Sequence, residues 1–201
     1  MPNYTNFIKT ITTAYAKEND IKDESNAFEK MTTDLILKNY NLSPDDLDDG
    51  NVDGRLDGGI DGFYIFVNDR YIKNDEDFEP ETIQKYPKIE LYLIQNKFTN
   101  HFDETPILKL HNTTERLLDE QDELGGVAEH IIEKCNLFHA VWNQLLTKMP
   151  TVSLSLIYVA NAGNKTHYPS VIRLAENKQK HLQERYQNSF KINIQLIDSL
   201  D

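Results

Sequence analysis

Three polar side chains on two predicted strands form the group with the clearest chemical potential. Asp61 lies in the run Gly58-Gly59-Ile60-Asp61-Gly62, and Gln95 follows 34 residues later, with Lys97 two positions further on. Side chains two apart on a strand point to the same face, so Gln95 and Lys97 project together. If the two strands pair, a carboxylate, an amide oxygen and an ammonium meet at one sheet edge. Such a set can bind a divalent metal and activate water, and it indicates phosphodiester hydrolysis.

The elements that must position these side chains follow an α/β order. Apolar runs predict strands over 60–67, 89–98, 151–159 and 190–197. Helical periodicity predicts helices over 6–17, 26–41, 105–118, 127–149 and 168–186. The acidic, glycine-rich segment 45–59 is expected to be loop, and the polar segment 68–88 an excursion or flexible insertion. This order predicts a three-layer fold, with a central mixed β-sheet flanked by helices.

Composition limits the classes of protein to consider. With 201 residues, 39% hydrophobic and 27% charged, the chain is expected to form a single domain over 1–201. No apolar run approaches the roughly 20 residues that span a bilayer, and the start lacks a signal-peptide pattern. The single Cys135 excludes an internal disulfide and is expected to be buried on a helix. We therefore expect a cytoplasmic protein without membrane contact. Because the chain stops directly after a predicted strand, it is also expected as the N-terminal part of something longer.

The charge distribution opposes a simple nucleic-acid binder. The chain has 33 acidic and 21 basic residues, which gives a net charge of -12, whereas phosphate contacts favour a basic face. The acidic residues concentrate in 45–57, 69–81 and 119–133, and the segment 165–185 carries Lys165, Arg173, Lys178, Lys180 and Arg185. This segregation of charge is compatible with a local basic surface.

The order of motifs resembles the PD-(D/E)xK, or restriction-endonuclease-like, nuclease superfamily. The Gln-x-Lys form at 95–97 and the segment 58–62 are similar to its Mrr-like branch. The chain is most similar to the N-terminal domain of AIPR-type abortive phage infection proteins. The resemblance covers 28–97 by motif and nearly the whole chain by order of elements. The proline that names the superfamily is absent, because Ile60 precedes Asp61.

This resemblance implies a role for four residues. Asp61 matches the metal-binding aspartate, Gln95 stands where most members have a glutamate, and Lys97 matches the lysine. Glu29 matches an acid on a helix that completes the site. The implied cofactor is Mg²⁺ or Mn²⁺, held by Asp61, Gln95 and Glu29. The implied activity is endonuclease cleavage of DNA, more than of RNA, in phage defence or restriction, and the resemblance allows a homodimer.

Several alternatives stay open. Glu29 also fits a capping-box-like helix start, Asn26-Ala27-Phe28-Glu29. Gln95 removes one negative charge from the metal site, which favours a catalytically degenerate module that only binds within a larger defence protein. The segment Asp49–Asp57 matches the first nine positions of a calcium-binding loop, but Ile60 stands where the loop needs its final glutamate. The six histidines show no paired zinc-ligand spacing.

Overall fold

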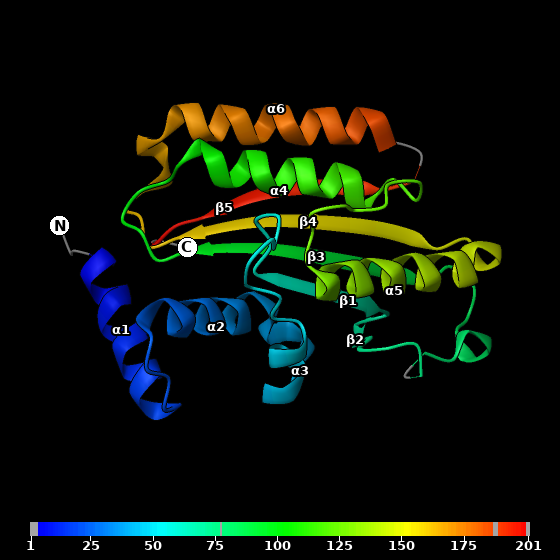
Figure 1. Ribbon diagram of the computed structural model, residues 1–201, viewed down its shortest axis with the longest axis horizontal. Helices are drawn as coiled ribbons and strands as arrows, with labels where there is room; N and C mark the ends of the chain where they lie inside the picture. The colour runs from blue at the N-terminus through cyan, green and yellow to red at the C-terminus, as the bar shows by residue number, and fades with distance from the viewer. Residues whose placement is uncertain (1–3, 77, 187–188, 200–201) are drawn as a thin grey trace.

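The computed structural model describes residues 4–76, 78–186 and 189–199, and its centre is a five-stranded sheet (Figure 1). The strands lie in the order β2-β1-β3-β4-β5. Their bounds are β1 (Gly62–Val67), β2 (Arg70–Tyr71), β3 (Lys88–Lys97), β4 (Thr151–Ala160) and β5 (Lys191–Ile197). β1 runs antiparallel to β2 and β3, whereas β3, β4 and β5 are parallel. The predicted α/β class with a mixed sheet is confirmed. The ends of the expected domain, 1–3 and 200–201, lie outside the described residues.

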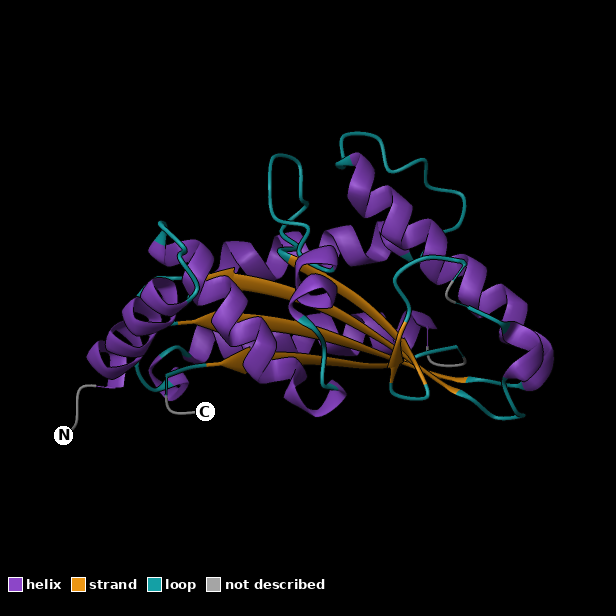
Figure 2. Cartoon of the chain, turned by 90° about the horizontal axis from the view of Figure 1, so that it is seen from below, coloured by secondary structure: helices purple, strands orange, loops and turns teal. Residues whose placement is uncertain are grey.

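Helices cover both faces of the sheet (Figures 1 and 2). One face carries α1 (Tyr4–Glu18), α2 (Glu24–Leu37) and the short α3 (Pro44–Asp49). The other face carries α4 (Glu104–Leu117) and α6 (Pro169–Tyr186), and α5 (Glu129–Leu145) packs into the same core as α4. None of the helices in the described part of the chain is long and apolar enough to cross a membrane.

Alternation along β1 divides the core between the two faces. Phe63, Ile65 and Val67 join the core under α4 and α5, while Tyr64 and Phe66 join Phe28 of α2 on the opposite face. All six residues of β1 are buried, because the strand lies inside the sheet and is covered on both sides. Cys135 is buried in α5, as predicted.

Segment 45–59 is predicted to be loop, but its first residues belong to helix α3. Ser43 caps α3, because its hydroxyl accepts the Asp46 N–H at 3.2 Å while the Asp46 carboxylate accepts the Ser43 N–H at 3.2 Å. Pro44 occupies the first turn, where its missing N–H is harmless. This reciprocal cap explains why an acidic sequence without an apolar stripe still forms a helix turn.

The polar segment 68–88 is packed against the domain in its described part, so of the two predicted alternatives the flexible insertion is wrong and an ordered excursion between β1 and β3 remains. It contains β2 and a short 3₁₀ turn over Pro80–Thr82. Ile72 and Phe78 are buried in the main core, and the Lys148 ammonium donates to the carbonyls of Pro80 and Ile83. Two apolar anchors in a polar sequence are therefore enough to hold the segment.

Side chains of α6 and the turn before it occupy the outer edge of β5. The amide oxygens of Gln179 and Gln183 accept the N–H groups of Ile194 and Ile192, each at 2.8 Å. The Gln183 amide also donates to the Phe190 carbonyl at 2.9 Å, and Lys165 donates to the Leu196 carbonyl at 3.1 Å. Gln179 and Gln183 are four residues apart on a helix, a rise of about 6 Å. Their partners Ile192 and Ile194 are two residues apart on a strand, about 6.6 Å, so the two glutamines can reach both N–H groups. We call these three side chains the β5 edge clasp.

We expect the Gln183→Ala variant to be less stable than the wild type by about 1–3 kcal/mol, because it leaves two backbone groups of the β5 edge without partners. Urea unfolding followed by circular dichroism measures this difference. The matched control is Lys180→Ala on the same helix, because Lys180 makes an exposed ion pair to Glu184 at 3.8 Å; it should change stability by less than about 0.5 kcal/mol. Equal losses in both variants would contradict the role of the clasp.

Candidate functional site

The backbone of Asp61 is fixed from both sides just before β1. Its N–H donates to the Ile94 carbonyl of β3 at 2.8 Å, and its carbonyl accepts the Val52 N–H at 2.8 Å. The next residue, Gly62, pairs with Ile94 in the antiparallel register. This register brings Asp61 alongside Gln95, as the sequence predicted for two paired strands.

The Asp61 carboxylate is buried, with only 2% of the residue exposed. Its Oδ2 atom accepts two hydrogen bonds of 2.6 Å, from the Gln95 amide and from the Asn96 N–H. Its Oδ1 atom is buried and has no hydrogen-bond partner among the described residues. Burial raises the pKa of Asp61 to about 6, although the nearby Lys97 ammonium and the Asn96 N–H oppose the shift. A buried carboxylate oxygen without a partner is costly, and it marks where a cation or water would bind.

Gln95 and Lys97 have different positions relative to this carboxylate. Gln95 is 1% exposed and turns its NH₂ group to Asp61, while its amide oxygen faces the backbone at Gly59. To act as the predicted oxygen ligand, this amide would have to turn over. Lys97 is partly exposed, and within the described residues its ammonium has no hydrogen bond or ion pair. Its charge nevertheless lowers the pKa values of Asp61 and Glu29, so Lys97 faces the site with its donors unused.

Glu29 lies beside the Asp61 carboxylate and does not cap the start of α2. The cap of α2 is Asp23, whose carboxylate accepts the Asn26 N–H at 3.0 Å, so the alternative of a capping box at 26–29 is wrong. Glu29 is half-buried and shares with Asp61 and Asn51 the lining of a cavity of ≈ 10 Å³, about the room for one water. Burial raises the pKa of Glu29 to about 8, and the carboxylates of Asp61 and Asp53 contribute to this shift.

Asn96 links the strand that carries Gln95 and Lys97 to the helix that carries Glu29. Its amide oxygen accepts the Thr32 hydroxyl at 2.9 Å, and its NH₂ group lies 3.4 Å from the Thr33 hydroxyl. The predicted alternation of β3 already placed Asn96 on the opposite face from its two neighbours, but its role in holding α2 was not predicted. Together with its N–H bond to Asp61, this link brings the two acids to the same place.

Two more carboxylates approach Asp61 from the acidic loop. Asp53 and Asp57 each place an oxygen within 4.8 Å of the other two acids, so Asp53, Asp57 and Asp61 form a group that could hold a metal ion. Asp49, the first position of the calcium-like loop, is instead paired with Lys134 at 2.5 Å and with the Tyr71 hydroxyl at 2.5 Å. Asp53 and Asp57 therefore converge on Asp61, whereas Asp49, the expected first ligand of a calcium loop, is engaged elsewhere.

The Gly58-Gly59 turn holds this loop against α4. Both glycines have positive φ angles, +64° and +84°. A Cβ atom on Gly59 would lie 2.8 Å from the Lys109 Cβ and 3.1 Å from the Gln95 amide oxygen. The Thr113 hydroxyl donates to the Gly58 carbonyl at 2.7 Å. The glycines before Asp61 are thus required both by backbone conformation and by close approach to α4.

We expect Gly59→Ala to lower the free energy of unfolding by about 1–3 kcal/mol, because alanine meets both a positive φ and a short contact. Gly125→Ala is the matched control, since Gly125 is exposed and nothing lies within 4 Å of its added Cβ; it should be neutral or slightly stabilising. Chemical denaturation of both variants compares them. A Gly59→Ala protein as stable as the control would disprove the tight fit of the turn.

We expect the stability of the metal-free protein to depend on pH through Glu29. A carboxyl group with a raised folded-state pKa binds a proton on folding, so its contribution is full below its ordinary pKa of 4.5 and is lost as pH rises through about 8. Glu29→Gln should therefore match the wild type near pH 5 and exceed its melting temperature by roughly 3 °C near pH 9. Thermal unfolding in EDTA measures this, with Glu18→Gln, an exposed glutamate of α1, as control. A difference that does not change with pH would contradict the assignment.

The chain matches no protein-family model, no curated protein and no solved structure. The likeness to the nuclease superfamily therefore depends on the motifs at 58–62 and 95–97.

Proposed function

We propose that this chain is a divalent-metal-dependent nuclease that hydrolyses phosphodiester bonds at the Asp61 site. The observation that carries the proposal is the Oδ1 atom of Asp61, which is buried and has no hydrogen-bond partner among the residues described. The partly exposed Lys97 ammonium acts on the same carboxylate. A carboxylate oxygen and an ammonium that both lack partners within the described part of the chain suit a site that receives a cation and a phosphate.

The donor set fits a hard divalent cation. Carboxylate oxygens are the ligands that Mg²⁺ and Mn²⁺ prefer, and Asp53 and Asp57 approach Asp61 within 4.8 Å. These two acids replace the negative charge that Gln95 removes from the site. We propose Asp61 as the main ligand, with Glu29 and the two loop acids as further oxygen donors. Gln95 would join them only with its amide turned over, because its NH₂ group is bonded to Asp61 in this structure. A bound cation would supply Lewis-acid polarisation of the phosphodiester and a more acidic water.

Each protein group has a proposed role that follows from its position. Gln95 and the Asn96 N–H hold the Asp61 Oδ2 atom, which leaves Oδ1 directed at the site. Lys97 would donate to a phosphate oxygen and stabilise the negative charge that grows in the transition state. Glu29 lines the same small cavity as Asp61, so it would supply a second carboxylate to the cation, directly or through one of its waters.

The finer assignments depend on the resemblance. We propose a restriction-endonuclease-like fold, DNA as a better substrate than RNA, and a role in phage defence or restriction. The competing proposal is a degenerate nuclease fold that binds nucleic acid or protein without cleavage. Gln95 and the net charge of -12 favour this second proposal, so cleavage and binding have to be measured on the same variants.

We expect the wild type to cleave plasmid, linear or single-stranded DNA, or RNA, when Mg²⁺ or Mn²⁺ is present. Lys97→Ala should reduce the cleavage rate by about 100-fold or more, because it removes a donor to the transition state, and should change Mn²⁺ affinity little. Asp61→Asn should lose both cleavage and Mn²⁺ binding. The matched control is Lys191→Ala, because Lys191 starts the parallel strand β5 and Lys97 ends β3.

The same set of variants separates the two proposals. Equal cleavage by wild type and Lys97→Ala would disprove the mechanism. A wild type that binds Mn²⁺ through Asp61 and binds nucleic acid through Lys97, but cleaves none of the four substrates, would establish the degenerate module.

A further inference from the structure

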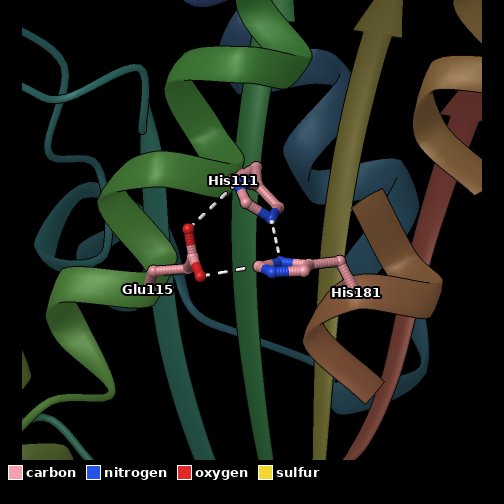
Figure 3. A group of neighbouring side chains, drawn as sticks. All are labelled: His111, Glu115 and His181. Atoms are coloured by element: carbon pink, nitrogen blue, oxygen red, sulfur yellow. Dashed lines mark hydrogen bonds and ion pairs between the residues drawn. The ribbon is translucent and has the colours of Figure 1, made fainter. Parts of the chain in front are cut away.

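A second polar group lies between α4 and α6, away from the Asp61 loop. It consists of His111 and Glu115 on α4 and His181 on α6 (Figure 3). The two histidines are 70 residues apart in the chain, so no spacing of zinc ligands could reveal them. Figure 3 shows the two rings and the carboxylate directed at one another across the gap between the helices.

The distances within this group match those between ligands of one metal ion. The Nε2 atom of His111 lies 3.3 Å from the Nδ1 atom of His181. The Glu115 Oε1 atom lies 3.6 Å from His181 Nδ1, and one ligand atom from each of the three residues lies within 4.8 Å of the other two. The second carboxylate oxygen, Oε2, lies 3.5 Å from His111 Nδ1, the ring nitrogen that faces away from the proposed metal. Two nitrogens bound tetrahedrally to zinc at about 2.0–2.1 Å are separated by about 3.3–3.4 Å. The pair therefore already has the spacing that zinc requires.

Asn112 prepares His111 for this role. The Asn112 amide oxygen lies 3.1 Å from His111 Nδ1, and an amide oxygen only accepts hydrogen bonds. This contact favours the tautomer with the proton on Nδ1, in which the lone pair of Nε2 faces His181. A hydrogen bond at the other ring nitrogen is the usual support for a metal-bound histidine. The His111 side chain is 1% exposed, and burial lowers its pKa, which favours the neutral form that ligates metals.

We propose that His111, Glu115 and His181 bind a zinc ion that joins α4 to α6 and leaves a fourth position to solvent. Two imidazoles and one carboxylate suit Zn²⁺ better than Mg²⁺ or Ca²⁺, which prefer oxygen ligands only. The site is independent of the nuclease proposal. Lys109 and Thr113 contact the Gly58-Gly59 turn, whereas His111 and Glu115 lie two positions further along α4, on its opposite side.

Two cations compete with a metal at this site. The Arg185 guanidinium lies 2.8 Å from the Glu115 Oε1 atom. The Lys178 ammonium lowers the pKa of His111 by charge repulsion. Removing the Arg185 charge should therefore tighten zinc binding, a gain that a purely structural role of Glu115 does not produce.

The test is a calorimetric titration of the full chain with Zn²⁺. The protein is first treated with EDTA and dialysed, and the titration is carried out in a buffer with saturating Mg²⁺. We expect the wild type to bind zinc, His181→Ala and Glu115→Gln to bind at least about tenfold more weakly, and Arg185→Gln to bind several-fold more tightly. His181 and Glu115 are not part of the apolar core, so both variants should fold. His167→Ala is the control for an exposed histidine outside the group, and Arg173→Gln is the control for charge on α6.

Asp61→Asn separates the two sites. Zinc affinity that is unchanged in Asp61→Asn but lost in His181→Ala supports the proposal, whatever the outcome of the cleavage assay. No zinc binding by the wild type at millimolar concentration, or His181→Ala binding as tightly as His167→Ala, would overturn it. Zinc binding that disappears only in Asp61→Asn would also overturn it, because the metal would then lie at the acidic site.

Discussion

Burial of the Asp61 carboxylate is the constraint on which the arrangement around it depends. An ionised group inside a sheet is unfavourable unless hydrogen bonds compensate for its burial. Gln95 and the Asn96 N–H each donate one hydrogen bond to the Oδ2 atom of Asp61. Those bonds need the β1–β3 register, because a slip of one residue would turn Gln95 to the other face. Asn96 in turn fastens α2. The compensation stops at Oδ1, which has no hydrogen-bond partner among the described residues; under the proposed function, this is the oxygen that the cation would bind.

Helix α4 connects the two candidate sites without belonging wholly to either. One side of it receives the Gly58-Gly59 turn through Lys109 and Thr113. The other side presents His111 and Glu115 to α6. Between them, Leu110, Leu117 and neighbouring apolar residues bury the helix in the core. A helix held by its apolar stripe can carry a different polar group on each flank, and this rigidity suits sites that need fixed side chains.

The parts of this structure that were predictable depend on local patterns. The apolar runs predict the strands β1 and β3 but not the direction in which they pair, and the antiparallel register of the structure brings Asp61 to Gln95. Helix α3 was missed because its signal is a cap at Ser43 and not an apolar stripe. The approach of Asp53 and Asp57, the orientation of the Gln95 amide and the meeting of His111 with His181 depend on tertiary contacts, and no spacing in the chain encodes them.

The β5 edge clasp has a consequence for assembly. Open sheet edges invite strands from other chains, but on β5 the N–H groups of Ile192 and Ile194 and the carbonyl of Leu196 already bind Gln183, Gln179 and Lys165. The opposite edge is β2, only two residues long. Copies of this chain therefore cannot readily merge their sheets into one. A dimer of this protein would associate through helices or loops, and each subunit would keep its own complete sheet with its own Asp61 site.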